Sequence, residues 1–154
     1  MPLLSVNHRQ DGMSLHSDGT PALDALQKEL TRTTGPVRIM IHGFNHAPGS
    51  PRHCPHEGIL SLAPVRQGPR IVSWPRNLGL RGQRGEPLVI GFGWPAQGGL
   101  PGAYRAAAAA GQALARLVAE CRPDRPVQIV AHSLGARVAL QALHHVAPGR
   151  ISHM

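Results

Sequence analysis

One stretch, residues 127–136, constrains the fold of this chain more than any other part of the sequence. It reads VQIVAHSLGA, a short β-rich run that passes directly into a turn and then into apolar residues at helical spacing. Small residues, Ala131 and Gly135, stand two positions before and two after Ser133. A sharp strand-to-helix turn strains the backbone at its centre and leaves room only for small neighbours. The stretch therefore predicts a strand, a tight turn and a helix.

Ser133 occupies the position at which such a turn carries a nucleophile. The pattern has the form of a nucleophile elbow, with Ala131 where glycine is usual. The hydroxyl would lie at a helix N-terminus, where backbone N–H groups favour developing negative charge. We expect the Leu134 amide to donate to an oxyanion. Gly135 is expected to support the turn, because its lack of a side chain avoids a steric clash there. His132 is expected to point away from the hydroxyl and to support the loop.

A second motif, His42-Gly-Phe-Asn45, follows directly after the β-rich run at residues 37–41. Acyl transfer needs a second N–H group aimed at the oxyanion, and the Phe44 amide is the candidate donor. Gly43 would let the backbone turn inward. We expect His42 and Asn45 to hold this loop by hydrogen bonds rather than to transfer protons. Two such motifs, each at the carboxyl end of a predicted strand, are more specific together than apart.

The remaining segments predict an α/β fold. Strands and helices alternate through the second half, which favours a mostly parallel sheet with flanking helices. An Asp-Gly pair predicts an N-terminal hairpin formed by residues 3–10 and 13–16. Thr20 as N-cap and Pro21 as first helical residue predict a short helix that ends at Gly35. Strands are predicted at residues 37–41, 71–74, 88–92 and 127–131, and helices at residues 103–121 and, largely buried, 134–146.

The two motifs together resemble the α/β-hydrolase superfamily. Within it the chain looks like the bacterial alpha/beta hydrolases of unknown function marked by HGFN, here residues 42–45, and AHS-x-G-x-R, here residues 131–137. The GFGWP run at residues 91–95 and the following helix with Tyr104 are also similar, so the resemblance covers roughly residues 35–147. The resemblance implies an α/β-hydrolase-like fold with a serine nucleophile, then an acidic residue after a later strand, and then a histidine after the last strand.

The sequence after Ser133 departs from that order. Only His144, His145 and His153 follow it as bases, and no Asp or Glu follows it. His144 and His145 lie about ten residues along the helix, or roughly 16 Å away, which favours ordinary helix-end positions. We therefore expect a fold truncated after the elbow helix, without further strands, in which residues 1–154 form one domain corresponding to the N-terminal part of the fold. The general base stays unassigned, with His46 the nearest alternative.

Two functions remain open from the sequence. The first is a serine hydrolase that cleaves a small-molecule acyl substrate in an esterase-like reaction, with Ser133 as nucleophile and without a cofactor. The second is a non-catalytic α/β-hydrolase-like binding or interaction protein that lacks a complete triad. A truncated sheet would leave an open edge, so a second copy of the chain or another partner is expected to cover it.

One Pro-rich loop gathers residues with metal-ligating side chains. Imidazole, thiolate and carboxylate groups are all ligands for zinc, but their spacing here matches no closed zinc site. An exposed loop with incidental histidines is the favoured interpretation, a loop lining the Ser133 pocket is the second, and a metal-binding protein is the third. The residues concerned are His46, His53, Cys54, His56 and Glu57.

Composition excludes several other classes. The formal charge of +8 comes from arginines dispersed along the chain, and only 3% of the residues are aromatic, so nucleic-acid binding is not expected. No apolar run approaches the roughly 20 residues that span a bilayer, and no secretion signal precedes residue 10. Two cysteines are too few for a disulfide framework. These features predict a cytoplasmic protein with no membrane partner.

Overall fold

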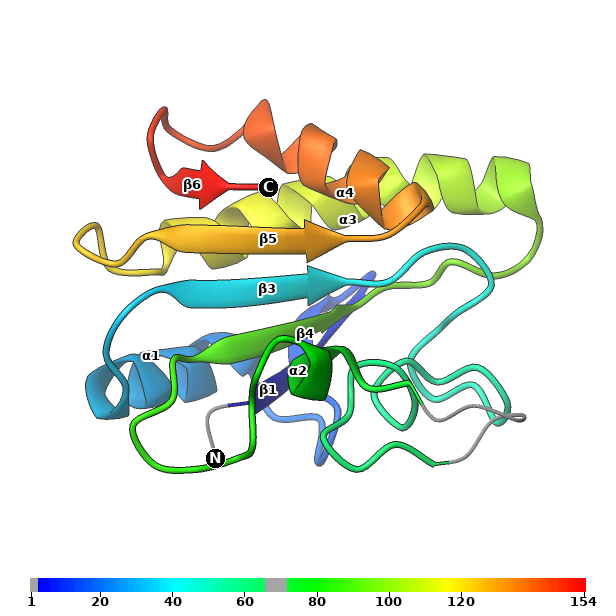
Figure 1. The fold of residues 1–154 in the computed structure, drawn as a ribbon. Coiled ribbons are helices and arrows are strands. Elements are labelled where there is room, and N and C mark those ends of the chain that lie inside the picture. The colour runs from blue at the N-terminus through cyan, green and yellow to red at the C-terminus, as the bar shows by residue number, and fades with distance from the viewer. Residues whose placement is uncertain (1–2, 66–71) are drawn as a thin grey trace.

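A computed structural model describes residues 3–65 and 72–154 of the chain. These residues form a six-stranded sheet in the order β2-β1-β4-β3-β5-β6 (Figure 1). Along the chain the elements are β1 (Leu3–Arg9), β2 (Gly12–Leu15), α1 (Ala22–Arg32), β3 (Val37–Ile41), α2 (Trp74–Asn77), β4 (Val89–Gly93), α3 (Leu100–Ala119), β5 (Val127–Ala131), α4 (Leu134–Leu143) and β6 (Ile151–His153).

The sheet is parallel except at one edge. β1 pairs antiparallel with β2 in the predicted hairpin, and it pairs parallel with β4. The pairs β3–β4, β3–β5 and β5–β6 are also parallel. Parallel strands need crossover connections, and along the chain α3 connects β4 to β5 and α4 connects β5 to β6. The predicted mostly parallel α/β sheet with flanking helices is confirmed.

The two faces of the sheet are covered differently. Alternate residues of β3, such as Ile39 and Ile41, pack with α1, α3 and α4 in the larger core. Met40 points to the other face, where it packs with Leu60 and Leu80 of the segment around α2. Figure 1 accordingly shows α1 and α3 behind the strands and α2 in front of them. The carboxyl ends of β3 and β5 carry the two predicted motifs.

Small residues bring α3 and α4 close together. A Cβ on Gly111 of α3 would stand 2.5 Å from the Gln141 Cβ and 2.9 Å from the Val138 carbonyl oxygen of α4. Glycine in a helix interior costs about 1 kcal/mol relative to alanine. This close approach explains why a glycine is used there, because any side chain would force the helices apart.

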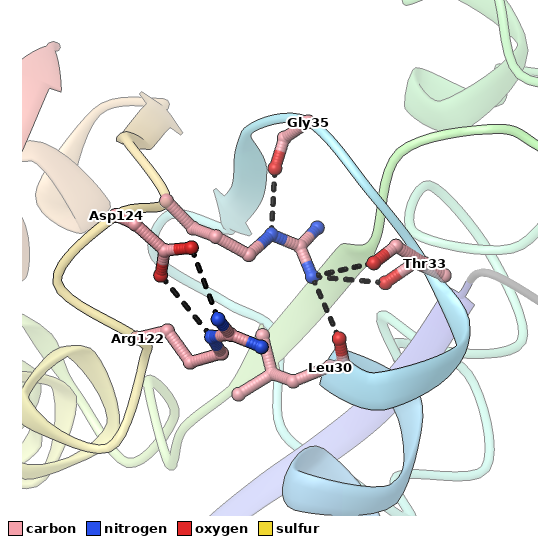
Figure 2. Close-up of polar contacts among 6 residues, drawn as sticks. Leu30, Thr33, Gly35, Arg122 and Asp124 are labelled. Atoms are coloured by element: carbon pink, nitrogen blue, oxygen red, sulfur yellow. Dashed lines mark hydrogen bonds and ion pairs between the residues drawn. The ribbon is translucent and has the colours of Figure 1, made fainter.

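Arg125 ties the end of α1 to the start of β5. Its guanidinium is buried and donates to the carbonyl oxygens of Gly35 at 2.7 Å, Leu30 at 3.2 Å and Thr33 at 3.1 Å (Figure 2). The last carbonyls of a helix have no partner within the helix, and the bond to Leu30 satisfies one of them, while the other two bonds hold the chain that follows α1. The neighbouring ion pair between Arg122 and Asp124, at 3.1 Å, is exposed and contributes little by comparison.

The prediction of a strand at residues 71–74 is wrong for residues 72–74, which the structure describes. Ile71 lies outside the described residues, Val72 and Ser73 form no strand, and Trp74 begins the short helix α2. The Ser73 hydroxyl accepts a hydrogen bond from the Arg76 N–H, and Pro75 stands in the first turn. A serine cap followed by proline is a helix start, and this local chemistry outweighed the apolar run.

The predicted start of α1 and the predicted end of α4 need smaller corrections. Thr20 is not the N-cap of α1, because its N–H and hydroxyl both donate to the Asp18 carboxylate and Pro21 takes the cap position. The elbow helix α4 ends at Leu143 instead of residue 146. It is also less buried than predicted, with Leu140 55% and Leu143 43% exposed.

β6 corrects the expectation that no strand follows the elbow helix. Ile151 pairs parallel with Val127 of β5, and the Ser152 hydroxyl donates to the Val127 carbonyl oxygen at 3.1 Å. This strand is too short to give a periodic sequence signal. None of the helices in residues 3–65 and 72–154 combines the length and hydropathy that a bilayer crossing requires.

Candidate active site

Ser133 stands in a strained turn between β5 and α4. Its backbone has φ 53° and ψ −125°, in a region that L-residues rarely adopt. The strand ends two residues earlier at Ala131, and the helix begins one residue later at Leu134. The Ser133 residue is exposed. Strain of this kind persists only where the surrounding structure holds it, and it is frequent at functional sites.

The loop after β3 packs directly against this turn. The His132 N–H donates to the Ile41 carbonyl oxygen at 3.2 Å, which extends the β3–β5 pairing into the turn. A Cβ on Gly43 would stand 2.9 Å from the Ser133 Cβ, and a Cβ on Gly135 would stand 2.5 Å from the His42 carbonyl oxygen. Only glycine fits at either position. The structure thus brings together the two motifs that the sequence placed at separate strand ends.

Two backbone amides near Ser133 find no acceptor among the residues that the structure describes. Within the described part of the chain, neither the Phe44 N–H nor the Leu134 N–H donates a hydrogen bond. The amides that follow each of them are occupied: Asn45 donates to the Ala96 carbonyl and Gly135 to the His132 carbonyl. Leu134 is the first residue of α4, where the helix dipole adds positive potential.

His42 is buried and uses both ring nitrogens. Nε2 accepts the Trp94 backbone N–H at 3.0 Å, so Nδ1 carries the proton and donates to the Gly43 carbonyl oxygen at 2.9 Å. The Trp94 indole N–H donates to the His42 carbonyl oxygen at 2.9 Å. Burial lowers the pKa of His42 to about 4, which keeps the ring neutral. These bonds fix the backbone that carries Gly43 and Phe44.

The partner of His42 is Trp94, whose hydrogen bonds to this loop the sequence did not predict. It is fully buried and its ring stacks on the imidazole with centroids 5.6 Å apart. The GFGWP run could have indicated this contact, because it places a tryptophan at the carboxyl end of β4, the strand next to β3.

Asn45 and His46 continue the loop. Asn45 has φ 72°, the second non-glycine residue with positive φ in the described chain. His46 Nδ1 lies 3.2 Å from the Phe44 carbonyl oxygen, an arrangement in which Nδ1–H donates and Nε2 keeps its lone pair. The pKa of His46 is lowered mainly by burial and further by the nearby His53 and His132.

The other predicted residues lie at different distances from the turn. His132 is exposed and its ring meets the edge of Trp74 at a centroid distance of 6.2 Å. Arg137 lies 3.6 Å above the Tyr104 ring and so joins α4 to α3. His144 and His145 follow the end of α4 and are exposed.

The metal-ligating residues of the Pro-rich loop separate into two groups. His46 and His53 lie near each other with ring centroids 6.2 Å apart, beside His42. Cys54 and Glu57 instead gather around His16, which comes from the end of the N-terminal hairpin. The sequence pattern did not include His16 in this set.

Two hollows of about 680 Å³ and 650 Å³ lie elsewhere on the described surface. The first lies between the end of α1 and the loop before β4, and the second lies beside α2 and the loop that follows it. Ser133 lines neither hollow and is an exposed residue.

Comparison with known proteins bears on this arrangement. No curated protein and no solved structure matches the chain. A family model, described as Alpha/beta hydrolase of unknown function (DUF900), matches residues 20–151, which include α1, both motifs and the strands that carry them. The chain therefore belongs to this family of alpha/beta hydrolases of unknown function.

Proposed function

We propose that the protein is a serine hydrolase that cleaves small-molecule acyl esters, with Ser133 as the nucleophile. The observation that carries the proposal is the backbone of Ser133, which is held at positive φ at a strand–helix junction while the residue remains exposed. A turn of this kind costs of order 1–3 kcal/mol. Presentation of a hydroxyl to a substrate is the role that this turn has in serine hydrolases.

The Phe44 and Leu134 amides would form the oxyanion hole. Both come from backbone that is held against Ser133 by the contacts of Gly43 and Gly135. Donors that are already in place before the reaction stabilise the developing oxyanion without reorganisation. This argument also assigns His42 a supporting role, since its two ring nitrogens are engaged by Trp94 and Gly43.

We propose His46 as the general base, because the loop that carries it packs against the Ser133 turn at Gly43. Burial lowers its pKa, so the ring is neutral near pH 7, and the Phe44 carbonyl holds Nδ1–H so that Nε2 can accept a proton. In the first step the Ser133 oxygen bonds to the acyl carbon and its proton moves to Nε2. The tetrahedral intermediate then expels the alcohol, which takes that proton. Water hydrolyses the acyl-enzyme by the same route.

Intact-mass analysis after treatment with a fluorophosphonate tests the nucleophile. The wild-type chain should gain one adduct and Ser133→Ala none. Ser17→Ala, which removes another exposed serine, should label like the wild type. Circular dichroism must show that all three proteins are folded. Labelling of Ser133→Ala, or its absence in all three folded proteins, would refute the proposal.

A second candidate is a non-catalytic binding protein with the same fold. The observation that favours it is that the ring hydrogen bonds of His42 and His46 go to backbone groups, those of Gly43, Trp94 and Phe44. This candidate predicts that folded wild-type protein shows no labelling and no hydrolysis of short-chain aryl esters. The labelling experiment therefore separates the two.

A further inference from the structure

We propose that His16, Cys54 and Glu57 form a binding site for a divalent transition metal ion, with Zn²⁺ the preferred occupant. His16 Nε2 lies 3.7 Å from the Cys54 sulfur and 3.8 Å from the Glu57 Oε1. All three potential ligand atoms lie within 4.8 Å of one another. The site joins the N-terminal hairpin to the loop between β3 and α2, and it is separate from Ser133.

The distances fit a tetrahedral ion. With zinc bonds of about 2.3 Å to sulfur and 2.0–2.1 Å to nitrogen, tetrahedral ligands stand roughly 3.6 Å apart for sulfur and nitrogen. The observed 3.7 Å is near this value, and the 3.8 Å contact with Glu57 requires only a small side-chain rotation. The latter distance is too long for a hydrogen bond between the two groups. The three ligand atoms therefore lie close enough together for a single ion to contact all of them.

Asn7 provides a second, independent observation. Its side chain is 2% exposed, its Nδ2 lies 3.5 Å from His16 Nδ1, and its Oδ1 has no hydrogen-bond partner among the described residues. Turning the amide by half a rotation exchanges the two atoms, so that Oδ1 accepts from His16 Nδ1–H. This bond would leave the Nε2 lone pair directed at the ion. Histidine ligands of metals are commonly oriented in this way through their second nitrogen.

His56 adds a second unpartnered group. It is 6% exposed, and neither ring nitrogen forms a hydrogen bond within the described chain. Its ring lies 4.7 Å from that of His16, centroid to centroid, and its Nε2 stands 2.5 Å from the position of a Cβ on Gly93. Buried polar groups nearly always have partners, so an unsatisfied histidine that packs against the His16 ring points to a ligand.

The burial of the three ligands suits an ion at the base of a loop. Cys54 is 1% exposed, His16 is mostly buried and Glu57 is half exposed. The thiolate supplies a soft ligand and the carboxylate faces water, which leaves a fourth position for water or for a nitrogen of His56. A bound ion would hold the loop at Cys54 and Glu57 against the N-terminal hairpin at His16.

Cys121 offers a matched control. It is also 1% exposed, but its sulfur contacts the Leu117 carbonyl oxygen of its own helix, and no metal-ligating cluster of described residues includes it. Replacement of either cysteine by serine removes one buried thiol. Only the Cys54→Ser change would remove a ligand.

Titration of chelator-treated protein with Co²⁺ and Zn²⁺ tests the site. We expect one equivalent of Co²⁺ to bind with a thiolate-to-cobalt absorption band in the near ultraviolet, and Zn²⁺ to displace it. Cys54→Ser should lose the band, and His16→Gln should weaken binding at least about tenfold. Cys121→Ser should behave like the wild type.

Each variant must be shown to be folded before its metal binding is compared with that of the wild type. Circular dichroism identifies variants that fail to fold, and His16→Gln provides the second ligand change if Cys54→Ser is unfolded. Absence of the band in folded wild-type protein would overturn the proposal. Equal binding by Cys54→Ser, or loss of the band only in Cys121→Ser, would overturn it as well. Failure of this proposal is distinguishable from failure of the proposed function, because the cobalt band reports metal binding and fluorophosphonate labelling reports the reactivity of Ser133.

Discussion

Gly43 and Ser133 are in such close contact that a Cβ at position 43 would stand 2.9 Å from the Ser133 Cβ. The same Cβ would stand 2.8 Å from the His132 carbonyl oxygen, which is backbone and cannot rotate away. The close fit of these two residues couples the loop after β3 to the elbow. It also means that the position of the Phe44 amide depends on the absence of a side chain at residue 43.

Gly43→Ala should therefore damage both stability and reactivity. We expect a loss of about 1–3 kcal/mol in the free energy of unfolding, because the added methyl group overpacks the contact. We expect fluorophosphonate labelling of Ser133 to slow by about a hundredfold, because a donor of the oxyanion hole is displaced. Urea denaturation and labelling kinetics measure the two effects.

Gly102→Ala is the control for this change. Gly102 lies in the first turn of α3, where an added Cβ meets no atom within 4 Å. This variant should be as stable as the wild type or slightly more stable, since alanine favours helix. A Gly43→Ala protein with unchanged stability and labelling would contradict the packing described here.

Arg125 should be worth far more to stability than its neighbour Arg122. Arg125→Met leaves the Leu30, Thr33 and Gly35 carbonyls without their donor, and we expect a cost of about 2 kcal/mol. Arg122→Met breaks only an exposed ion pair with Asp124 and should change stability by less than about 1 kcal/mol. Equal effects in urea denaturation would show that the capping role of Arg125 is wrong.

His42 should make the fold less stable in mild acid. Its pKa is about 4 in the folded chain against 6.5 for an ordinary histidine, so the unfolded chain binds the proton first as the pH falls. The stabilisation is complete above pH 6.5 and is lost progressively between pH 6.5 and pH 4. From pH ~7.5 to pH ~5 this single group should lower the free energy of unfolding by about 2 kcal/mol.

Urea denaturation of the wild type and of His42→Gln, each at pH ~7.5 and at pH ~5, measures this effect. Glutamine can accept the Trp94 N–H but does not titrate, so its pH dependence should be weaker than that of the wild type by the stated amount. An NMR titration that placed the pKa of His42 near its ordinary value would contradict the burial and the two hydrogen bonds that explain the shift.

His46 should control the reaction if it is the base. His46→Gln should reduce the rate of ester hydrolysis by about a hundredfold or more, while His53→Gln, a change at the neighbouring ring, should leave the rate within about twofold. Because burial lowers the pKa of His46, the rate should stay constant near neutral pH and fall only at a pH below the ordinary histidine value. Equal rates for His46→Gln and wild type would remove His46 from the mechanism.

The sequence determined the local parts of this protein. The strand–turn–helix around Ser133 and the turn after β3 follow from small residues and β-rich runs that act on the backbone over only a few positions. The hairpin at β1 and β2, the strands β3 and β5, and the helix α3 were predictable for the same reason, to within a few residues at their ends.

Only the tertiary structure decided which distant groups meet. His16 and Cys54 are 38 residues apart, and the pair His42 and Trp94 is 52 residues apart. Such pairs depend on how the crossovers pack and on the register of β4 beside β3, which no local pattern encodes. The brief strand β6 and the capping of α1 by Arg125 have the same origin. Their energies come from hydrogen bonds formed only after the sheet is assembled, so the sequence alone could not reveal them.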